Sequence, residues 1–192
     1  RDLLNELKGK NMKNHIAFEF FSPPPRKFLE MVAETIPNFN MQISPESHDE
    51  KIRRAFGRAY DNHSLERSIE NALELGCKRV DVFFMVGLPG QTSQSVSQTI
   101  GYCEELLEKY GGTGFQPVKT RPRWPCHCSD GKIHPYISPL APFLDPGSLA
   151  FEDPQKYGYR LFYKTLEEHR QALLQPSWKY MLNYETEWMS RD

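Results

Sequence analysis

Short apolar segments recur along the chain at intervals too long for hairpins, and this spacing constrains the fold more than any other feature. Residues 15–21, 39–44 and 79–86 each have the length and apolar content of a strand. Because helical patterns lie between them, neighbouring strands are expected to pair in parallel through right-handed crossovers. The 192 residues are fewer than the ~250 of a complete eight-stranded barrel. The sequence therefore predicts an α/β fold with parallel strands, in the form of an open sheet or, as we prefer, a partial α/β barrel.

The remaining elements follow from caps, stops and helical spacing. Helices are expected over residues 26–35, 49–56, 64–75, 92–109 and 157–174, with Ser64 as the N-cap of the third. One more strand is expected at 133–138. These elements divide the chain into a barrel-like part at 1–110, an insertion at 111–131, a last barrel strand and loop at 132–150, and an aromatic-rich helical extension at 151–192.

The predicted strands each have one apolar side and one side that carries a carboxylate or an amide. Burying such a group without a partner costs about 1–3 kcal/mol, so these side chains need either a ligand or each other. We favour a polar ligand in a partly hydrated barrel lumen for Glu19, Gln42 and Ser44, which lie near strand ends. For Asp81, at the start of its strand, ligand contact and hydrogen bonding between strands stay equally open.

The first strand-end motif is ISPESH, residues 43–48. Pro45 removes a backbone N–H, so the chain is expected to leave the sheet sharply. Ser44, Glu46 and Ser47 then bring hydroxyl and carboxylate groups to the carboxyl end of the strand. A carboxylate there suits a pair of ribose hydroxyls or an ammonium group. The alternative, that Ser47 and Asp49 simply cap the next helix, is compatible with ligand contact. His48, beside Glu46, is a candidate for a role near the ligand.

The second motif is FFMVGLPGQT, residues 83–92. Gly87 would let another molecule approach the backbone closely, and Gly90 permits a positive φ before the next helix. Thr92 or Ser93 is expected to cap that helix. This is not the phosphate-binding loop G-x-x-x-x-G-K-[ST], because no lysine follows Gly90.

Together, the two motifs resemble the second half of the core of radical S-adenosylmethionine (radical SAM) enzymes, over about residues 1–110 and 132–192. The resemblance implies S-adenosylmethionine as cofactor, held by residues from both motifs: Ser44, Glu46 and Ser47 at the ribose and methionine, and Met85, Gly87, Leu88 and Pro89 at the adenine. Glu19, Gln42, His48 and Asp81 are then candidates on the substrate side. The stretch HPYISPLAPFLDPGS and the aromatic residues after it resemble the subgroup with an N-terminal cobalamin-binding domain.

The family binds a [4Fe-4S] cluster through C-x-x-x-C-x-x-C, and this motif is absent from the sequence. The four cysteines stand at 77, 103, 126 and 128. The resemblance therefore implies a C-terminal portion of a radical SAM enzyme that is inactive alone and offers no ligands to the cluster or to cobalamin. Catalytic residues are not identified. The alternatives are a non-catalytic subunit that completes a barrel with a second polypeptide, a gene remnant, or an unrelated nucleotide-binding α/β barrel enzyme.

Residues 111–131 are rich in proline, glycine and basic side chains. A link of this length without periodicity is unusual inside a compact domain. We expect an insertion tolerated at the surface. The alternative is a loop that covers a substrate or contacts RNA, because aromatic residues alternate there with cations.

Charge and hydropathy exclude further classes of protein. The net charge of −1 makes nucleic acid an unlikely partner. The sequence has no run of ~18 apolar residues, so no membrane-spanning segment is expected. The cysteines form no disulfide framework and the first residues do not resemble a leader, so we expect a cytoplasmic protein.

Overall fold

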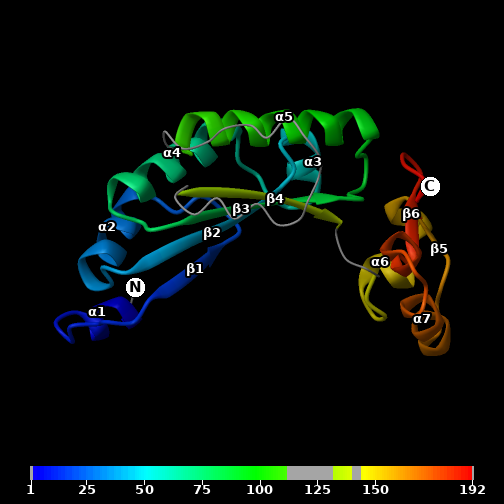
Figure 1. Cartoon of the computed structure of the whole chain (residues 1–192), viewed down its shortest axis with the longest axis horizontal. Helices are drawn as coiled ribbons and strands as arrows, with labels where there is room; N and C mark the ends of the chain where they lie inside the picture. The colour runs from blue at the N-terminus through cyan, green and yellow to red at the C-terminus, as the bar shows by residue number, and fades with distance from the viewer. Residues whose placement is uncertain (1, 112–131, 140–143, 192) are drawn as a thin grey trace.

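The computed structural model describes residues 2–111, 132–139 and 144–191. Its centre is a parallel sheet whose strands lie in chain order (Figure 1). The strands are β1 (Ile16–Phe20), β2 (Phe39–Glu46), β3 (Val80–Val86) and β4 (Ile133–Pro139). The predicted α/β fold and parallel pairing are confirmed. The described strands do not close into a barrel, which agrees with a partial one.

Helix α1 (Asp2–Leu7) precedes the first strand. The helices that follow lie between the strands and cover one face of the sheet: α2 (Arg26–Thr35), α3 (Glu50–Ala55), α4 (Asn62–Glu74) and α5 (Ser93–Tyr110). Figure 1 shows α3, α4 and α5 above the sheet. The predicted cap of α4 is wrong. Asp61 is the N-cap, because its carboxylate accepts a hydrogen bond of 2.7 Å from the backbone N–H of Ser64.

The two faces of the sheet differ as the alternation predicts. Met41, Val82 and Phe84 are fully buried in one continuous apolar core with the helices. On the opposite side of the strands, Glu19 is exposed and Gln42, its partner in register, is half-buried. The polar face is therefore the one that a barrel would enclose.

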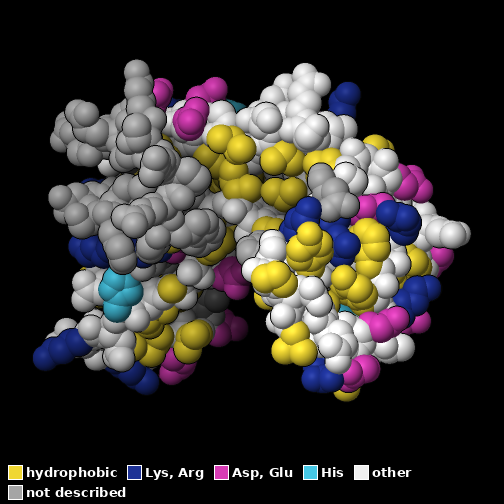
Figure 2. Space-filling view, turned by 45° about the vertical axis from the view of Figure 1, so that its right-hand side comes forward, with side chains coloured by type: hydrophobic (Ala, Val, Ile, Leu, Met, Phe, Trp, Pro, Cys, Tyr) yellow, Lys and Arg dark blue, Asp and Glu magenta, His cyan; other side chains and the backbone are white. Residues whose placement is uncertain are grey.

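Residues 144–191 form a second, smaller unit, here called the C-terminal unit. It contains α6 (Leu149–Glu152), η1 (Gln155–Tyr157), β5 (Tyr159–Leu161), α7 (Leu166–Leu173), η2 (Trp178–Met181) and β6 (Tyr184–Thr186). β5 and β6 form an antiparallel pair. Figure 1 shows the unit beyond the carboxyl ends of the parallel strands, and Figure 2 shows hydrophobic and basic side chains interleaved on its forward face.

The single helix predicted over residues 157–174 is wrong. Gly158 takes a left-handed conformation, with φ of 70°, and ends η1. Tyr159–Leu161 then pairs as a strand, and the helix begins only after Thr165, where Thr165 and Glu168 form a capping box. The extension is thus aromatic-rich but mixed in structure. Most of the predicted insertion, residues 112–131, lies outside the described residues. No described helix combines the length and apolar character needed to cross a membrane.

Candidate functional site

The end of β2 has an unusual backbone at Glu46. Glu46 has a φ of 68°, in the left-handed region that non-glycine residues rarely adopt. A register irregularity precedes it: Ile43 pairs with Val82, and Glu46 with Phe84. The Glu46 side chain is 2% exposed, and Ser44 and Ser47 are also buried. Strained residues of this kind cluster at functional sites.

Arg58 holds one oxygen of the Glu46 carboxylate. Its Nη2 donates to Glu46 Oε1 at 3.0 Å, its Nε donates to the Ser44 carbonyl at 3.3 Å, and its guanidinium lies 4.6 Å from the ring centre of Phe21. The second oxygen, Oε2, is buried and has no hydrogen-bond partner among the described residues. Burial raises the pKa of Glu46, against the opposing effect of Arg58, and the negative charge of Glu19 raises it further.

Arg53 fixes the segment that carries Glu46 and Arg58. This arginine is fully buried, and desolvation is the main cause of its lowered pKa. Its Nε donates to the Ser47 carbonyl at 2.9 Å, its Nη1 donates to the Tyr60 carbonyl at 3.1 Å, and Nη2 donates to the Asn62 side chain. One side chain thereby joins the end of β2 to the start of α4.

The turn after β3 is organised by Gln91, whose side chain is fully buried. Its Oε1 accepts from the backbone N–H groups of Gly87 at 2.8 Å and Leu88 at 3.2 Å. Its Nε2 donates to the Met85 carbonyl at 2.9 Å. Thr92 caps α5 through a capping box, as predicted. The two turn amides are therefore already paired within the chain.

The other sequence-predicted residues lie in different surroundings. Leu88 is fully buried, whereas Met85 and Pro89 are partly exposed beside the turn. His48 lies against α5: its Nδ1 is 2.8 Å from Thr99 Oγ1, and burial lowers its pKa. The structure therefore does not bring His48 to the Glu46 carboxylate.

Asp81 is paired within the sheet. Its Oδ1 accepts from Arg79 Nε at 2.6 Å, and Arg79 also donates to the Tyr136 hydroxyl on the neighbouring strand β4. Asp81 is thus paired with an arginine of its own strand segment, and that arginine in turn bonds to β4. Both alternatives for Asp81 stay predictions. Asp81 also lies in register with Gln42.

Sequence reasoning assigned no role to Arg53, Arg58, Arg79 or Gln91, and the two arginines that pair with carboxylates, Arg58 and Arg79, show which signal was available. Arg58 follows the glycine that ends α3, in a stretch with no apolar period to interpret. Arg79 is the first residue of the predicted strand at 79–86, but its side chain was given no role. The available signal was their charge, because a cation near a buried carboxylate is the usual way to satisfy it.

The described cysteines are poor metal ligands. Cys77 and Cys103 are free and buried. Burial raises the pKa of both thiols, that of Cys103 to about 12, so they stay protonated at neutral pH. Within residues 2–111, 132–139 and 144–191, no three His, Cys, Asp or Glu side chains are grouped to hold a metal ion. Cys126 and Cys128 lie outside the described residues.

A cleft of about 590 Å³ opens beside the turn after β3. Pro89 and Gly90 line it together with residues at the starts of α3 and α5, among them Asp49, Ile52 and Ser95. Ser44, Glu46 and Ser47 do not line it. The cleft therefore adjoins the second motif only.

Comparisons with known proteins give one family and one fold. Residues 1–103, just over half of the chain, match the model of the Radical SAM superfamily. No curated protein matches the sequence. The structure is similar to coproporphyrinogen III oxidase from Escherichia coli, which is a radical SAM enzyme, with a TM-score of 0.51 and 15% sequence identity. The match covers 96% of this chain and 44% of that chain, so this chain spans less than half of that structure. At this identity the likeness shows the fold alone.

Proposed function

Because the chain belongs to the radical SAM superfamily, we propose that the carboxyl ends of β2 and β3 bind S-adenosylmethionine. One observation carries this proposal: Glu46 Oε2 is buried at the end of β2 without a hydrogen-bond partner in the described part of the chain. A carboxylate oxygen accepts hydrogen bonds and binds hydroxyl donors strongly. The ribose of the cofactor offers two hydroxyl groups, and they fit this unfilled acceptor.

The remaining residues of the two motifs are assigned around that contact. Arg58 keeps the Glu46 carboxylate in place through Oε1, which leaves Oε2 for the ribose. Ser44 and Ser47 are assigned to the ribose and methionine parts. Met85, Gly87, Leu88 and Pro89 are assigned to the adenine. Since Gln91 occupies the N–H groups of Gly87 and Leu88, this second contact rests on packing against the backbone. Glu19, Gln42, His48 and Asp81 stay candidates for the substrate side.

S-adenosylmethionine, when a reduced [4Fe-4S] cluster cleaves it, supplies the radical chemistry of this family. The two cysteines in the described part of the chain do not fit the cluster itself, because Cys77 and Cys103 are buried with raised thiol pKa values. The sequence also lacks the C-x-x-x-C-x-x-C motif. We therefore propose that the cluster thiolates come from outside these 192 residues, and that the chain alone is inactive. A second polypeptide, or further residues of a longer protein, would supply them.

Three finer proposals rest on the sequence. Cobalamin use is a prediction from the resemblance of residues 134–148 and of the aromatic residues after them. A barrel-completing subunit and a gene remnant stay as alternatives to an enzyme part, and a neighbouring reading frame with C-x-x-x-C-x-x-C would favour the enzyme. We also propose a reducing, cytoplasmic setting, because the described cysteines are free thiols. An unrelated α/β barrel enzyme is no longer an alternative, since the family is shown.

The cofactor proposal is tested by calorimetric titration of the whole chain with S-adenosylmethionine, adenosine and 2′-deoxyadenosine. We expect the wild type to prefer adenosine over 2′-deoxyadenosine, and Glu46→Ala to lose that preference, with about tenfold weaker binding of S-adenosylmethionine. Glu167→Ala, at an exposed position of α7, is the control and should bind like the wild type. A preference that survives in Glu46→Ala would rule out this contact.

The proposal of inactivity is tested separately. The purified chain is treated anaerobically with iron, sulfide and a reductant, and 5′-deoxyadenosine is measured after addition of S-adenosylmethionine. We expect none above the blank. Cofactor cleavage at an appreciable rate would show that the chain holds a working cluster.

A further inference from the structure

The turn after β3 is also contacted by residues that come seventy or more positions later. The Tyr159 hydroxyl donates a buried hydrogen bond of 3.0 Å to the Gly87 carbonyl. Tyr184 fills the other side of the same residue: a Cβ atom added at Gly87 would lie 2.9 Å from its hydroxyl oxygen and 3.1 Å from its ring. Both tyrosines belong to the C-terminal unit.

These two side chains are buried and packed against each other. Tyr159 and Tyr184 are each 4% exposed and form the small core of the unit with Leu144. They come from the paired strands β5 and β6, and their rings meet edge to face with centres 5.4 Å apart. Burial raises the pKa of Tyr159 well above its usual range, so its hydroxyl keeps the proton that it donates.

Gly87 is consequently held from both sides. Gln91, within the turn, accepts from its N–H, and Tyr159, from the C-terminal unit, donates to its C=O. Its φ of 98° requires glycine, and Tyr184 leaves no space for a side chain there. The conformation of the turn therefore depends on a part of the chain outside the sheet.

We propose that Tyr159 is a positioning residue for the turn after β3, and that Tyr184 shapes the space beside it, so that the C-terminal unit sets the affinity of the turn for its ligand. This inference rests on the proposed function, in which the turn packs against the adenine of S-adenosylmethionine. Neither tyrosine need touch the cofactor, because each acts through the backbone of Gly87.

The first test needs no ligand. Hydrogen exchange of the Gly87 and Leu88 amides is measured in the wild type, Tyr159→Phe and Tyr163→Phe. Tyr163 also loses a hydrogen bond, that from Arg191 Nη1 at 3.2 Å, but it lies elsewhere in the same unit. We expect about fivefold faster exchange in Tyr159→Phe and no change at these amides in Tyr163→Phe. Equal exchange in Tyr159→Phe and wild type would overturn the proposal.

The second test separates positioning from stability. S-adenosylmethionine and adenosine are titrated into the same three proteins, and their melting temperatures are recorded. We expect Tyr159→Phe to bind both ligands several-fold more weakly, whereas Tyr163→Phe changes only the melting temperature. Faster exchange with unchanged affinity for both ligands would overturn the positioning role. If the wild type binds neither ligand, the proposed function fails, and the exchange experiment alone decides whether the unit holds the turn.

A pair of glycine variants gives an independent test in case Tyr159→Phe does not fold. Gly87→Ala and Gly90→Ala both place a side chain at a positive φ, but no atom lies within 4 Å of the new Cβ at Gly90. We expect Gly87→Ala alone to increase exchange across β5 and β6, because its Cβ meets Tyr184. Equal exchange in the two variants would contradict the packing described for Tyr184.

Discussion

The sheet region, residues 2–111 with β4, and the C-terminal unit are stabilised in different ways. The sheet region has a continuous apolar core that receives side chains from every parallel strand. Among the described side chains, the core cluster of the C-terminal unit consists of Leu144, Tyr159 and Tyr184, and the amide of Asn183 is fully buried as well. A small core contributes little hydrophobic free energy, so directional contacts make up a larger share of the stability of this unit. We infer that the C-terminal unit opens locally before the sheet region unfolds.

The largest effect is expected in the core of the sheet region. Phe84 is 1% exposed and packs edge to face on Tyr102 of α5, so Phe84→Ala should lower the free energy of unfolding by about 3–5 kcal/mol. Urea denaturation followed by circular dichroism measures this. Ile100→Ala, on the exposed side of α5, is the control and should change stability by less than about 0.5 kcal/mol. A small effect at Phe84 would remove the distinction between the two regions.

A smaller and more local effect is expected at Asn183. Its Oδ1 accepts from the Leu144 N–H at 2.8 Å, and its Nδ2 donates to His169 Nε2 at 2.9 Å, since His169 Nδ1 donates to the Thr165 carbonyl. Asn183→Ala leaves the buried Leu144 N–H unpaired, at a cost of about 1–3 kcal/mol.

The expected consequence of Asn183→Ala is faster hydrogen exchange and proteolysis within residues 144–191, with the amides of β2 and β3 unchanged. Asn5→Ala, at an exposed position of α1, is the reference. Loss of protection in β2 and β3 as well would mean that the two regions unfold as one cooperative unit.

Two carboxylates, one in each region, should contribute to the pH dependence of stability with opposite signs. Burial raises the folded-state pKa of Glu46, so its contribution is present below its ordinary pKa near 4.5 and is lost as the pH rises through the raised value. Glu167 in α7 has a lowered pKa, because Arg170 and then Gln171 donate to it, so its contribution is present above about 4.5 and is lost as the pH falls.

Denaturation between pH 3 and 7 tests this difference with two matched variants. Relative to the wild type, Glu46→Gln should gain stability as the pH rises, and Glu167→Gln should lose it. The same slope for both variants would show that the Glu46 carboxylate is solvated in the folded protein.

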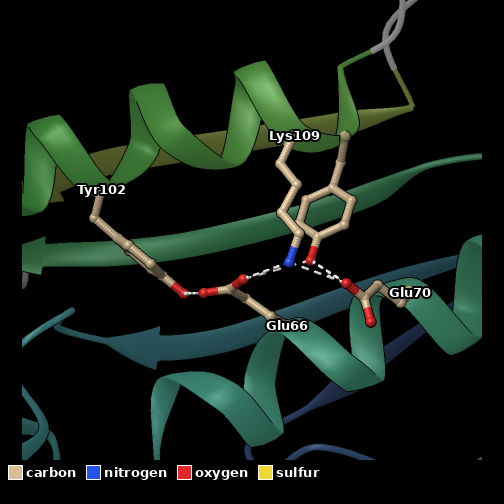
Figure 3. Close-up of polar contacts among 5 residues, drawn as sticks. Glu66, Glu70, Tyr102 and Lys109 are labelled. Carbon is tan, nitrogen blue, oxygen red and sulfur yellow. Dashed lines mark hydrogen bonds and ion pairs between the residues drawn. The ribbon is translucent and has the colours of Figure 1, made fainter.

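The smallest effect is expected at the outer surface of the sheet region. Figure 3 shows Lys109 of α5 between Glu66 and Glu70 of α4, at 2.9 and 3.0 Å, with the hydroxyl of Tyr102 3.1 Å from Glu66. Lys109 is half exposed, so Lys109→Met should cost less than about 1 kcal/mol. Raising the salt concentration should shrink the difference. Lys27→Met, at an exposed position of α2, is the control. A loss at Lys109 that salt does not reduce would indicate a packing contribution instead.

The sequence predicted the sheet region well because its signals are local. Apolar alternation located the parallel strands, and the prolines on either side limited α2 to the predicted residues 26–35. The same reasoning failed for the C-terminal unit. β5 and β6 have three residues each and pair across more than twenty positions, so neither produces a period that can be distinguished from that of a helix.

The candidate site was predicted in outline only. Ser44, Glu46 and Gly87 were found because a strand end, a proline and a glycine turn are visible in the sequence. The partners Arg58, Gln91 and Tyr159 were not assigned, since each meets its target through folding of a connection or of a distant unit. His48 was associated with Glu46 by adjacency, but its ring lies against α5.

If the proposed function holds, Arg53 has a consequence for ligand affinity. Its bonds to the carbonyl of Ser47, the carbonyl of Tyr60 and the side chain of Asn62 immobilise the loop around Glu46 while the protein folds. A loop that is already ordered loses little conformational entropy when a ligand arrives, so more of the contact energy appears as affinity. Without the Arg53 guanidinium, the Glu46 carboxylate would have to be ordered anew at every binding event. Arg53 would then govern the entropy of binding without itself contacting the ligand.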